Sequence, residues 1–173
     1  MDLKAVLRQV PGFPKPGITF IDVTTLLKNG NAFRESIRRL LEPFRFDPID
    51  RVVGVESRGF IFGAATAYEL GCGFVPVRKP RKLPADTYSE SYELEYGTDA
   101  LEIHRDAIEP GQRVLVVDDL LATGGTAEAV LKMLKKFDCT VVGIAFLVEL
   151  DFLNGRSKLK GVPIHTLVHY ESE

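Results

Sequence analysis

The residues with the clearest chemical potential lie in segment 114–126, Val-Leu-Val-Val-Asp-Asp-Leu-Leu-Ala-Thr-Gly-Gly-Thr. Small residues, two threonine hydroxyls and free backbone N–H groups at the start of an expected helix suit a dianionic phosphate. The adjacent carboxylates of Asp118 and Asp119 are instead suited to accept hydrogen bonds from a vicinal diol. A phosphate close to two ribose hydroxyls defines a 5-phosphoribosyl group. The segment therefore predicts a site for such a group.

Two common nucleotide-binding motifs are absent from the sequence. A Walker A loop requires Gly-x-x-x-x-Gly-Lys-Ser/Thr and a Rossmann fingerprint requires Gly-x-Gly-x-x-Gly, and the chain contains neither. An aspartate-rich turn that only capped a helix would not require paired acids directly before Thr-Gly-Gly-Thr. The phosphoribosyl interpretation is therefore favoured over these three alternatives.

Basic residues occur where other strands are expected to end. Four of the five residues from Arg78 to Lys82 are basic and follow the apolar run 74–77, and Arg58 closely follows the apolar run 52–55. The carboxyl ends of parallel strands form the ligand-binding edge of such sheets. We therefore expect these cations beside the phosphate-binding segment, where they could stabilise a departing pyrophosphate. Solvated surface positions are the alternative.

The elements that must position these residues follow a strand, helix, strand pattern. Strands are expected at 51–55, 74–77, 113–118, 140–150 and 164–168, and helices at 31–41, 60–70 and 126–137. This alternation indicates an α/β fold with a central, mostly parallel sheet flanked by helices. A short amphipathic helix is also expected at 3–10, because its apolar residues have helical spacing.

Two segments depart from this pattern. Two prolines and a glycine in 13–22 exclude a helix and favour an extended, turning path. Residues 84–107 alternate between apolar and polar, which predicts an antiparallel excursion that serves as a lid or binding loop. Within it, Glu95 could exchange a proton with a nitrogen base while the closed lid excludes water. A solvated glutamate is the alternative.

Length and composition limit the function further. The 173 residues suit one domain, and 22 basic against 24 acidic residues give a net charge of −2, which does not favour nucleic acid. Cys72 and Cys139 are 67 positions apart and lack metal-ligand spacing, so we expect buried thiols. The three histidines form no ligand pattern either. With no secretory segment and no apolar run of about twenty residues, the sequence predicts a soluble, cytoplasmic protein without a membrane partner.

Several segments resemble the adenine phosphoribosyltransferases of the type I phosphoribosyltransferase family. They are 13–20 (Phe-Pro-Lys-Pro-Gly-Ile-Thr-Phe), 56–60 (Glu-Ser-Arg-Gly-Phe), 78–84, 92–97 (Tyr-Glu-Leu-Glu-Tyr-Gly) and 114–126. Segment 114–126 identifies the wider family, whereas 13–20 and 92–97 point to its adenine branch. The resemblance implies the type I phosphoribosyltransferase fold as a single domain over 1–173. It also implies a small N-terminal hood at 1–30 that binds the base, and a flexible lid at 79–107.

The same resemblance implies a purine-salvage reaction in a homodimeric enzyme. Adenine and 5-phosphoribosyl 1-pyrophosphate would give AMP and pyrophosphate. Mg²⁺ would be the cofactor, bound mainly by substrate oxygens, so that no protein metal site is expected. Displacement at the anomeric carbon would pass through an oxocarbenium-like state.

The resemblance also assigns residues to the phosphoribosyl part of the site. Asp118 and Asp119 would face the ribose hydroxyls. The 5-phosphate would be held by Ala122, Thr123, Gly124, Gly125 and Thr126. The pyrophosphate-binding residues would be Ser57, Arg58, Arg78, Lys79 and Lys82, with Arg78 reaching a partner subunit's site. The peptide bond between Glu56 and Ser57 would be cis.

For the base, the resemblance implies an adenine pocket and a proton-transfer group. The adenine-binding residues would be Thr19, Phe20, Ile21 and Leu120. Glu95 and Arg58 would be catalytic, and Tyr96 would close with the lid. The family commonly has arginine where Ile21 stands. This change is harmless if the position acts through its backbone, but it weakens the adenine assignment if the side chain matters.

Two alternative functions remain open from the sequence. One is the same chemistry with another purine base, namely hypoxanthine, guanine or xanthine. The other is a regulator that retains the site as a sensor of 5-phosphoribosyl 1-pyrophosphate and binds nucleic acid. The near-neutral charge and the apparently complete set of catalytic positions argue against the regulator.

Overall fold

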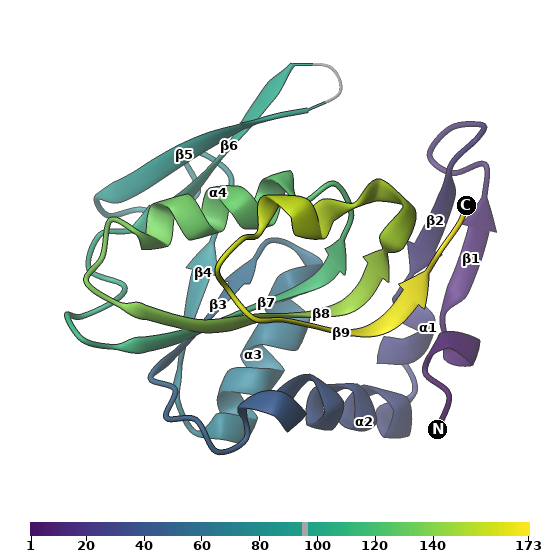
Figure 1. The fold of residues 1–173 in the computed structure, drawn as a ribbon, viewed down its shortest axis with the longest axis horizontal. Helices are drawn as coiled ribbons and strands as arrows, with labels where there is room; N and C mark the ends of the chain where they lie inside the picture. The colour runs from purple at the N-terminus through teal and green to yellow at the C-terminus, as the bar shows by residue number, and fades with distance from the viewer. Residues whose placement is uncertain (95–96) are drawn as a thin grey trace.

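A computed structural model of the chain describes residues 1–94 and 97–173. Its centre is a five-stranded sheet with the order β4-β3-β7-β8-β9, in which every pairing is parallel (Figure 1). The strands are β3 (Arg51–Val55), β4 (Gly73–Val77), β7 (Arg113–Leu121), β8 (Thr140–Leu150) and β9 (Ile164–Tyr170). The parallel sheet flanked by helices that the sequence predicts is confirmed.

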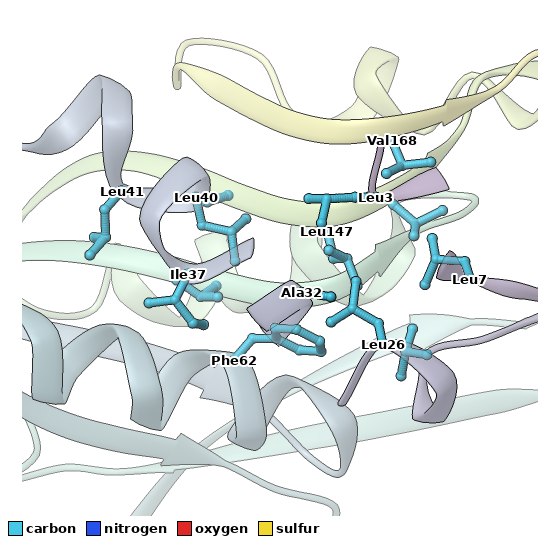
Figure 2. Packing of buried hydrophobic residues seen from close by; sticks show 14 of the residues in the cluster. Leu3, Leu7, Leu26, Ala32, Ile37, Leu40, Leu41, Phe62, Leu147 and Val168 are labelled. Carbon is cyan, nitrogen blue, oxygen red and sulfur yellow. The ribbon is translucent and has the colours of Figure 1, made fainter. Parts of the chain in front are cut away.

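The central strands are apolar because both faces of the sheet are covered. Along β7, Leu115 and Val117 pack into one buried cluster, whereas Val114 and Val116 pack into a second cluster on the opposite face. The first cluster is closed by α2 (Gly30–Leu41) and α3 (Arg58–Leu70), and Figure 2 shows its side chains meeting between helices and sheet. The second is closed by α4 (Gly125–Leu134) and by one strand of a hairpin.

Local signals fix where the helices begin and end. The side chain of Asn29 caps α2 by accepting a hydrogen bond from the backbone N–H of Ala32 at 3.1 Å. At the end of α3, Gly71 adopts the left-handed conformation, with φ of +69°. The start of α4 directly after segment 114–124 places the residues predicted to bind phosphate at a helix N-terminus.

The N-terminal segment differs from its prediction. The prediction of a helix over residues 3 to 10 is wrong. Only Lys4–Val6 form a helical turn, the short 3-10 helix η1, because β1 (Arg8–Pro11) pairs antiparallel with β2 (Thr19–Asp22). The apolar spacing is satisfied without a helix, since Leu3 and Leu7 are both buried. A one-turn helix, α1 (Thr24–Leu27), then leads to α2. The Phe13–Pro14 peptide bond is cis.

The predicted antiparallel excursion is confirmed as a hairpin of β5 (Thr87–Glu93) and β6 (Thr98–His104). Figure 1 shows it extending away from the sheet on the side of α4. Leu101 and Ile103 anchor β6 in the second cluster. Three short 3-10 helices complete the chain: η2 (Glu42–Phe44), η3 (Asp151–Leu153) and η4 (Gly155–Lys158). Within residues 1–94 and 97–173, no helix is long and apolar enough to cross a membrane.

Candidate functional site

A pocket of about 230 Å³ opens at the carboxyl ends of β3 and β7. The turn between β3 and α3 forms one wall, and the segment between β7 and α4 forms another. Its lining residues are Val55, Glu56, Ser57, Arg58, Asp118, Asp119, Leu120, Leu121, Ala122, Thr123, Gly124, Gly125, Thr126, Ala127 and Phe146. The fold thus brings together two segments that are about 60 residues apart in the sequence.

Residues 122–126, which we call the phosphate loop, form the floor of this pocket. Gly124 has φ of +88°, and a Cβ atom there would lie 2.4 Å from the carbonyl oxygen of Gly155. Only glycine fits both the conformation and the space. The loop leads into the first turn of α4, whose unpaired N–H groups and positive dipole end favour an anion.

Two carboxylates line the pocket beside the phosphate loop. The backbone N–H of Asp119 donates to Oδ1 of Asp118 at 2.9 Å. A Cβ atom on Gly59 would lie 2.4 Å from that same oxygen, so glycine is required for Asp118 to adopt this position. Burial raises the pKa of Asp118 well above its usual range, and the charge of Asp119 raises it further. The pocket therefore contains a buried carboxylate, that of Asp118, whose ionisation is costly.

Arg58 connects the carboxylates to the N-terminal segment. Its Nε lies 2.6 Å from Oδ2 of Asp119, and its guanidinium lies 5.2 Å from the ring centroid of Phe20. The ring of Phe13 contacts that of Phe20 edge to face at 5.2 Å. Residues 13–20 are thereby placed beside the pocket, although they contribute no lining residue to it.

Strand alternation separates Phe20 from its neighbours on β2. Ile21 is buried in the first cluster and, with Thr19, lines a small cavity that also includes Leu150 and Phe152. The side chain of Ile21 thus points away from the face that Phe20 presents to Arg58. An apolar side chain suits this environment, which accounts for isoleucine at this position.

The basic turn at 78–82 adjoins the pocket through Glu56. Oε1 of this glutamate accepts hydrogen bonds from the backbone N–H of Lys79 at 2.7 Å and from Nε of Arg78 at 3.3 Å. None of the basic side chains lines the pocket, and Lys82 is exposed. The turn is therefore held beside the site by Glu56, while its basic side chains lie outside the pocket lining.

Lys79 is instead engaged by the hairpin. Its ammonium group forms an ion pair with Asp99 and donates a hydrogen bond to the hydroxyl of Tyr92 at 3.0 Å. Burial acts to lower the pKa of Lys79, but these hydrogen bonds outweigh it and raise the pKa. The same ion pair lowers the pKa of Asp99. Lys79 thus links the end of β4 to both hairpin strands.

The structure unites only part of the predicted site. The pocket includes Ser57, Arg58, Asp118, Asp119, Leu120 and residues 122–126. Phe20 adjoins it through Arg58. The predicted residues outside its lining are Thr19, Ile21, Arg78, Lys79 and Lys82. Glu95 and Tyr96 lie outside the described residues. The expected cis bond between Glu56 and Ser57 is confirmed.

Sequence reasoning overlooked several residues around the pocket. Glu56 follows the same strand as Arg58, so its position at a strand end was the available signal. Tyr92 and Asp99 lie on facing hairpin strands as register partners, which the alternating pattern alone does not reveal. Phe146 lines the pocket from the middle of β8, where it is one apolar residue among many.

A second cluster of polar side chains lies at the carboxyl ends of β8 and β9. Glu149, Asp151 and His169 have the donor types of a metal site. However, both carboxylate oxygens of Glu149 accept hydrogen bonds from Arg156, at 2.7 and 2.8 Å, and Nδ1 of His169 lies 2.9 Å from Asp151. The donors are thus engaged by protein groups.

Comparisons with known proteins agree with this geometry. The family described as "Phosphoribosyl transferase domain" matches residues 22–162. An adenine phosphoribosyltransferase of Acaryochloris marina is 59% identical over 170 residues, covering 98% of this chain and 100% of the relative. One of Synechococcus sp. is 58% identical over 171 residues, covering 99% and 100%.

Solved structures give the same result. The adenine phosphoribosyltransferase of Rhodothermus marinus superposes with a TM-score of 0.93 at 54% identity, covering 97% of this chain and 96% of that one. That of Saccharomyces cerevisiae, solved with adenine and an imino-altritol bisphosphate, has a TM-score of 0.90 at 44% identity, with 95% and 96% covered. The likeness spans the pocket, the N-terminal segment and the hairpin together.

Proposed function

Since the chain belongs to the adenine phosphoribosyltransferases, within the phosphoribosyl transferase domain family, we infer that it transfers a 5-phosphoribosyl group from 5-phosphoribosyl 1-pyrophosphate to adenine. The products are AMP and pyrophosphate, and the reaction salvages free adenine. The observation that carries this conclusion is the meeting of phosphate loop, paired carboxylates and Arg58 in one pocket. The relatives supply the acceptor base.

The phosphate loop is proposed to hold the 5-phosphate. Its support is the run of small residues that leads into the N-terminus of α4. Asp119 and Asp118 are proposed to accept hydrogen bonds from the ribose hydroxyls, since both carboxylates lie beside the loop. The two contacts together would fix the anomeric carbon in the pocket.

Arg58 and Ser57 are proposed to face the pyrophosphate. As the bond to pyrophosphate breaks, positive charge develops on the ribose and negative charge on the leaving group. Arg58 would stabilise the leaving group, while Asp119 keeps the guanidinium in position. The side chains of Lys79, Lys82 and Arg78 would help to stabilise the pyrophosphate only after moving from the positions described above.

Adenine is proposed to lie between Phe20 and Leu120. Leu120 lines the pocket, and Phe20 adjoins it through Arg58. Backbone groups near Thr19 and Ile21 would form hydrogen bonds with the edge of the base. The inward-facing side chain of Ile21 supports a backbone role for that position. Hypoxanthine reverses the donor and acceptor at this edge, so such contacts would reject it.

Glu95 is proposed as the acid or base at the adenine imidazole nitrogens, with Tyr96 closing the lid at 79–107. The support is the family segment 92–97. Glu95→Gln should lower turnover and leave binding of 5-phosphoribosyl 1-pyrophosphate largely intact, with Glu93→Gln on β5 as its matched control. Unchanged single-turnover rates would remove Glu95 from this role.

Mg²⁺ is proposed to enter with the pyrophosphate-bearing substrate. Of the two carboxylates that line the pocket beside the phosphate loop, Asp119 is paired with Arg58, and ionisation of Asp118 is disfavoured. These donors suit contact with a metal-bound substrate better than a dedicated protein cage. When bound, the ion would neutralise charge on the pyrophosphate. Omitting Mg²⁺ should abolish turnover, which an assay with chelator tests.

The protein is further proposed to be one domain, with a hood at 1–30, and to act as a cytoplasmic homodimer. The exposed face of α3 supports a dimer, because Ile61 and Tyr68 lie one above the other there with 40% and 87% of their surface exposed. The free thiols of Cys72 and Cys139 suit a reducing compartment. Light scattering that gives a monomer mass would contradict the dimer.

One assay separates the proposed function from its alternatives. With Mg²⁺ and 5-phosphoribosyl 1-pyrophosphate present, adenine, hypoxanthine, guanine and xanthine are offered separately, and nucleotide formation is followed. AMP from adenine alone is the expected result. Turnover of another base would retain the mechanism and overturn the adenine pocket. No turnover, with salt-dependent binding to DNA or RNA, would favour the regulator.

A further inference from the structure

The phosphate loop rests on a neighbouring turn that does not line the pocket. A Cβ atom on Gly124 would lie 2.4 Å from the carbonyl oxygen of Gly155, and one on Gly155 would lie 2.4 Å from that of Ala122. The two backbones are therefore closely packed against each other. Any shift of Gly155 must be transmitted to the loop.

Gly155 begins η4, and the next residue ties this short helix to the sheet. Nε and Nη2 of Arg156 donate to Oε1 and Oε2 of Glu149 at 2.7 and 2.8 Å, which is a bidentate ion pair. The Glu149 side chain is only 5% exposed. Its register partner on β7 is Leu121, directly before the loop. The ion pair thus fixes η4 at the point where the phosphate loop leaves the sheet.

Groups on β9 hold Arg156 from the other side. Nη2 of Arg156 donates to the hydroxyl of Thr166 at 3.1 Å, and that hydroxyl is hydrogen-bonded to Nε2 of His169 at 2.8 Å. The guanidinium is consequently fixed by two strands at once. Neither Arg156 nor Glu149 lines the pocket. Any effect of Arg156 on a ligand must therefore be indirect, and the adjacent Gly155 is the residue that contacts the loop.

We propose that Arg156, paired with Glu149, is a positioning residue that sets the phosphate loop through Gly155. The inference rests on the proposed phosphate-binding role of that loop. Removing the guanidinium would leave the buried carboxylate of Glu149 with only His169, whose Nδ1 lies 3.8 Å from Oε2, and would release η4 from the sheet. The loop amides would then lose their alignment with the 5-phosphate, whereas the base site near Phe20 would be unaffected.

Calorimetric binding of ribose 5-phosphate to the full chain tests this proposal. Arg156→Gln should weaken binding by about tenfold or more, as small misplacements of a positioned group do. Arg156→Lys keeps the charge but lacks the planar guanidinium that forms two parallel hydrogen bonds, so it should weaken binding less than Arg156→Gln does. Gly155→Ala should reproduce the loss, because the added Cβ atom displaces the same contact. The KM for adenine should not change in any of these variants.

Arg113→Gln is the matched control. Arg113 begins β7, at the end of the strand away from the pocket, and its Nε donates to the carbonyl oxygen of Pro48 at 2.9 Å. This variant should bind ribose 5-phosphate as the wild type does. Equal affinities for Arg156→Gln and Arg113→Gln would overturn the proposal. If Arg156→Gln does not fold, Arg156→Lys decides in its place, and affinity equal to that of Arg113→Gln would overturn the proposal.

The two levels of the account remain separable in this experiment. Wild-type protein that binds ribose 5-phosphate but forms no AMP would contradict the proposed function, and the variants would still decide the positioning role by binding alone. Wild-type protein that fails to bind ribose 5-phosphate would overturn the positioning role, because the loop would then hold no phosphate.

Discussion

Arg58 and Asp119 form an ion pair across the mouth of the pocket, with Nε of the arginine 2.6 Å from Oδ2 of the aspartate. The aspartate side chain is 8% exposed and the arginine side chain 38%. The pair joins the turn after β3 to the end of β7. It therefore aligns the proposed leaving-group cation with the proposed ribose-binding carboxylate before substrate arrives.

Asp119→Asn should lower kcat/KM for 5-phosphoribosyl 1-pyrophosphate by about 10- to 100-fold, since hydrogen bonds to charged groups contribute roughly 1.5–3 kcal/mol. The amide keeps the shape but cannot hold the guanidinium as an ion pair. Steady-state kinetics measure the effect, and Asp138→Asn, at an exposed site, is the control. Identical constants for the two variants would show that the ion pair has no part in substrate binding.

Asp118→Asn should stabilise the fold at neutral pH while impairing activity. Burial raises the pKa of Asp118 in the folded protein, so the folded form binds its proton more tightly than the unfolded form does. The resulting cost to stability is present above the raised pKa and disappears as the pH falls towards the ordinary value of 3.8. The gain in Tm of the variant should therefore shrink on acidification. A gain that grows with falling pH would contradict this account.

Gly59→Ala should displace Asp118 and reduce both activity and stability. The added Cβ atom would lie 2.4 Å from Oδ1 of Asp118, and overpacking of this kind costs about 1–3 kcal/mol. Gly30→Ala, at the start of α2, has no atom within 4 Å of the added Cβ and is the matched control. Chemical denaturation measures both variants. If Gly59→Ala were as stable as Gly30→Ala, the close approach of residue 59 to Asp118 would be refuted.

Asp99→Asn should tighten binding of magnesium pyrophosphate by about two- to fivefold, the range of a partly exposed ion pair. The ammonium group of Lys79 is paired with Asp99, and it must leave this partner to reach pyrophosphate. Glu128→Gln, which breaks the surface pair with Lys132 on α4, is the control. Weaker binding by Asp99→Asn would instead mean that Asp99 orients Lys79 for the ligand.

The sequence predicted the elements whose signals are local. Val114–Val117 reads as a buried strand because both faces of β7 are covered, and the acids and small residues that follow it mark the pocket. The helix expected at 3–10 failed because Leu3 and Leu7 are buried by a turn and a strand, and pairing of β1 with β2 depends on residues about ten positions away.

The contacts that sequence could not supply are long-range ones. Lys79 was expected to bind pyrophosphate, but its ammonium group is paired with Asp99, which lies on a hairpin strand 20 residues later. Arg156 belongs to no motif in the sequence. Its proposed positioning role depends on two contacts of the fold, that of Gly155 with the phosphate loop and that of Glu149 with Leu121. Such pairs are determined by strand register and close packing, which spacing along the chain does not encode.

The most direct test of the account is a crystal structure of the protein with AMP. We expect the phosphate on the backbone of residues 122–126, the ribose hydroxyls at Asp118 and Asp119, and the adenine ring between Phe20 and Leu120. AMP bound outside the pocket, or with its phosphate away from the loop, would contradict the assignment of this site as the phosphoribosyl-binding centre.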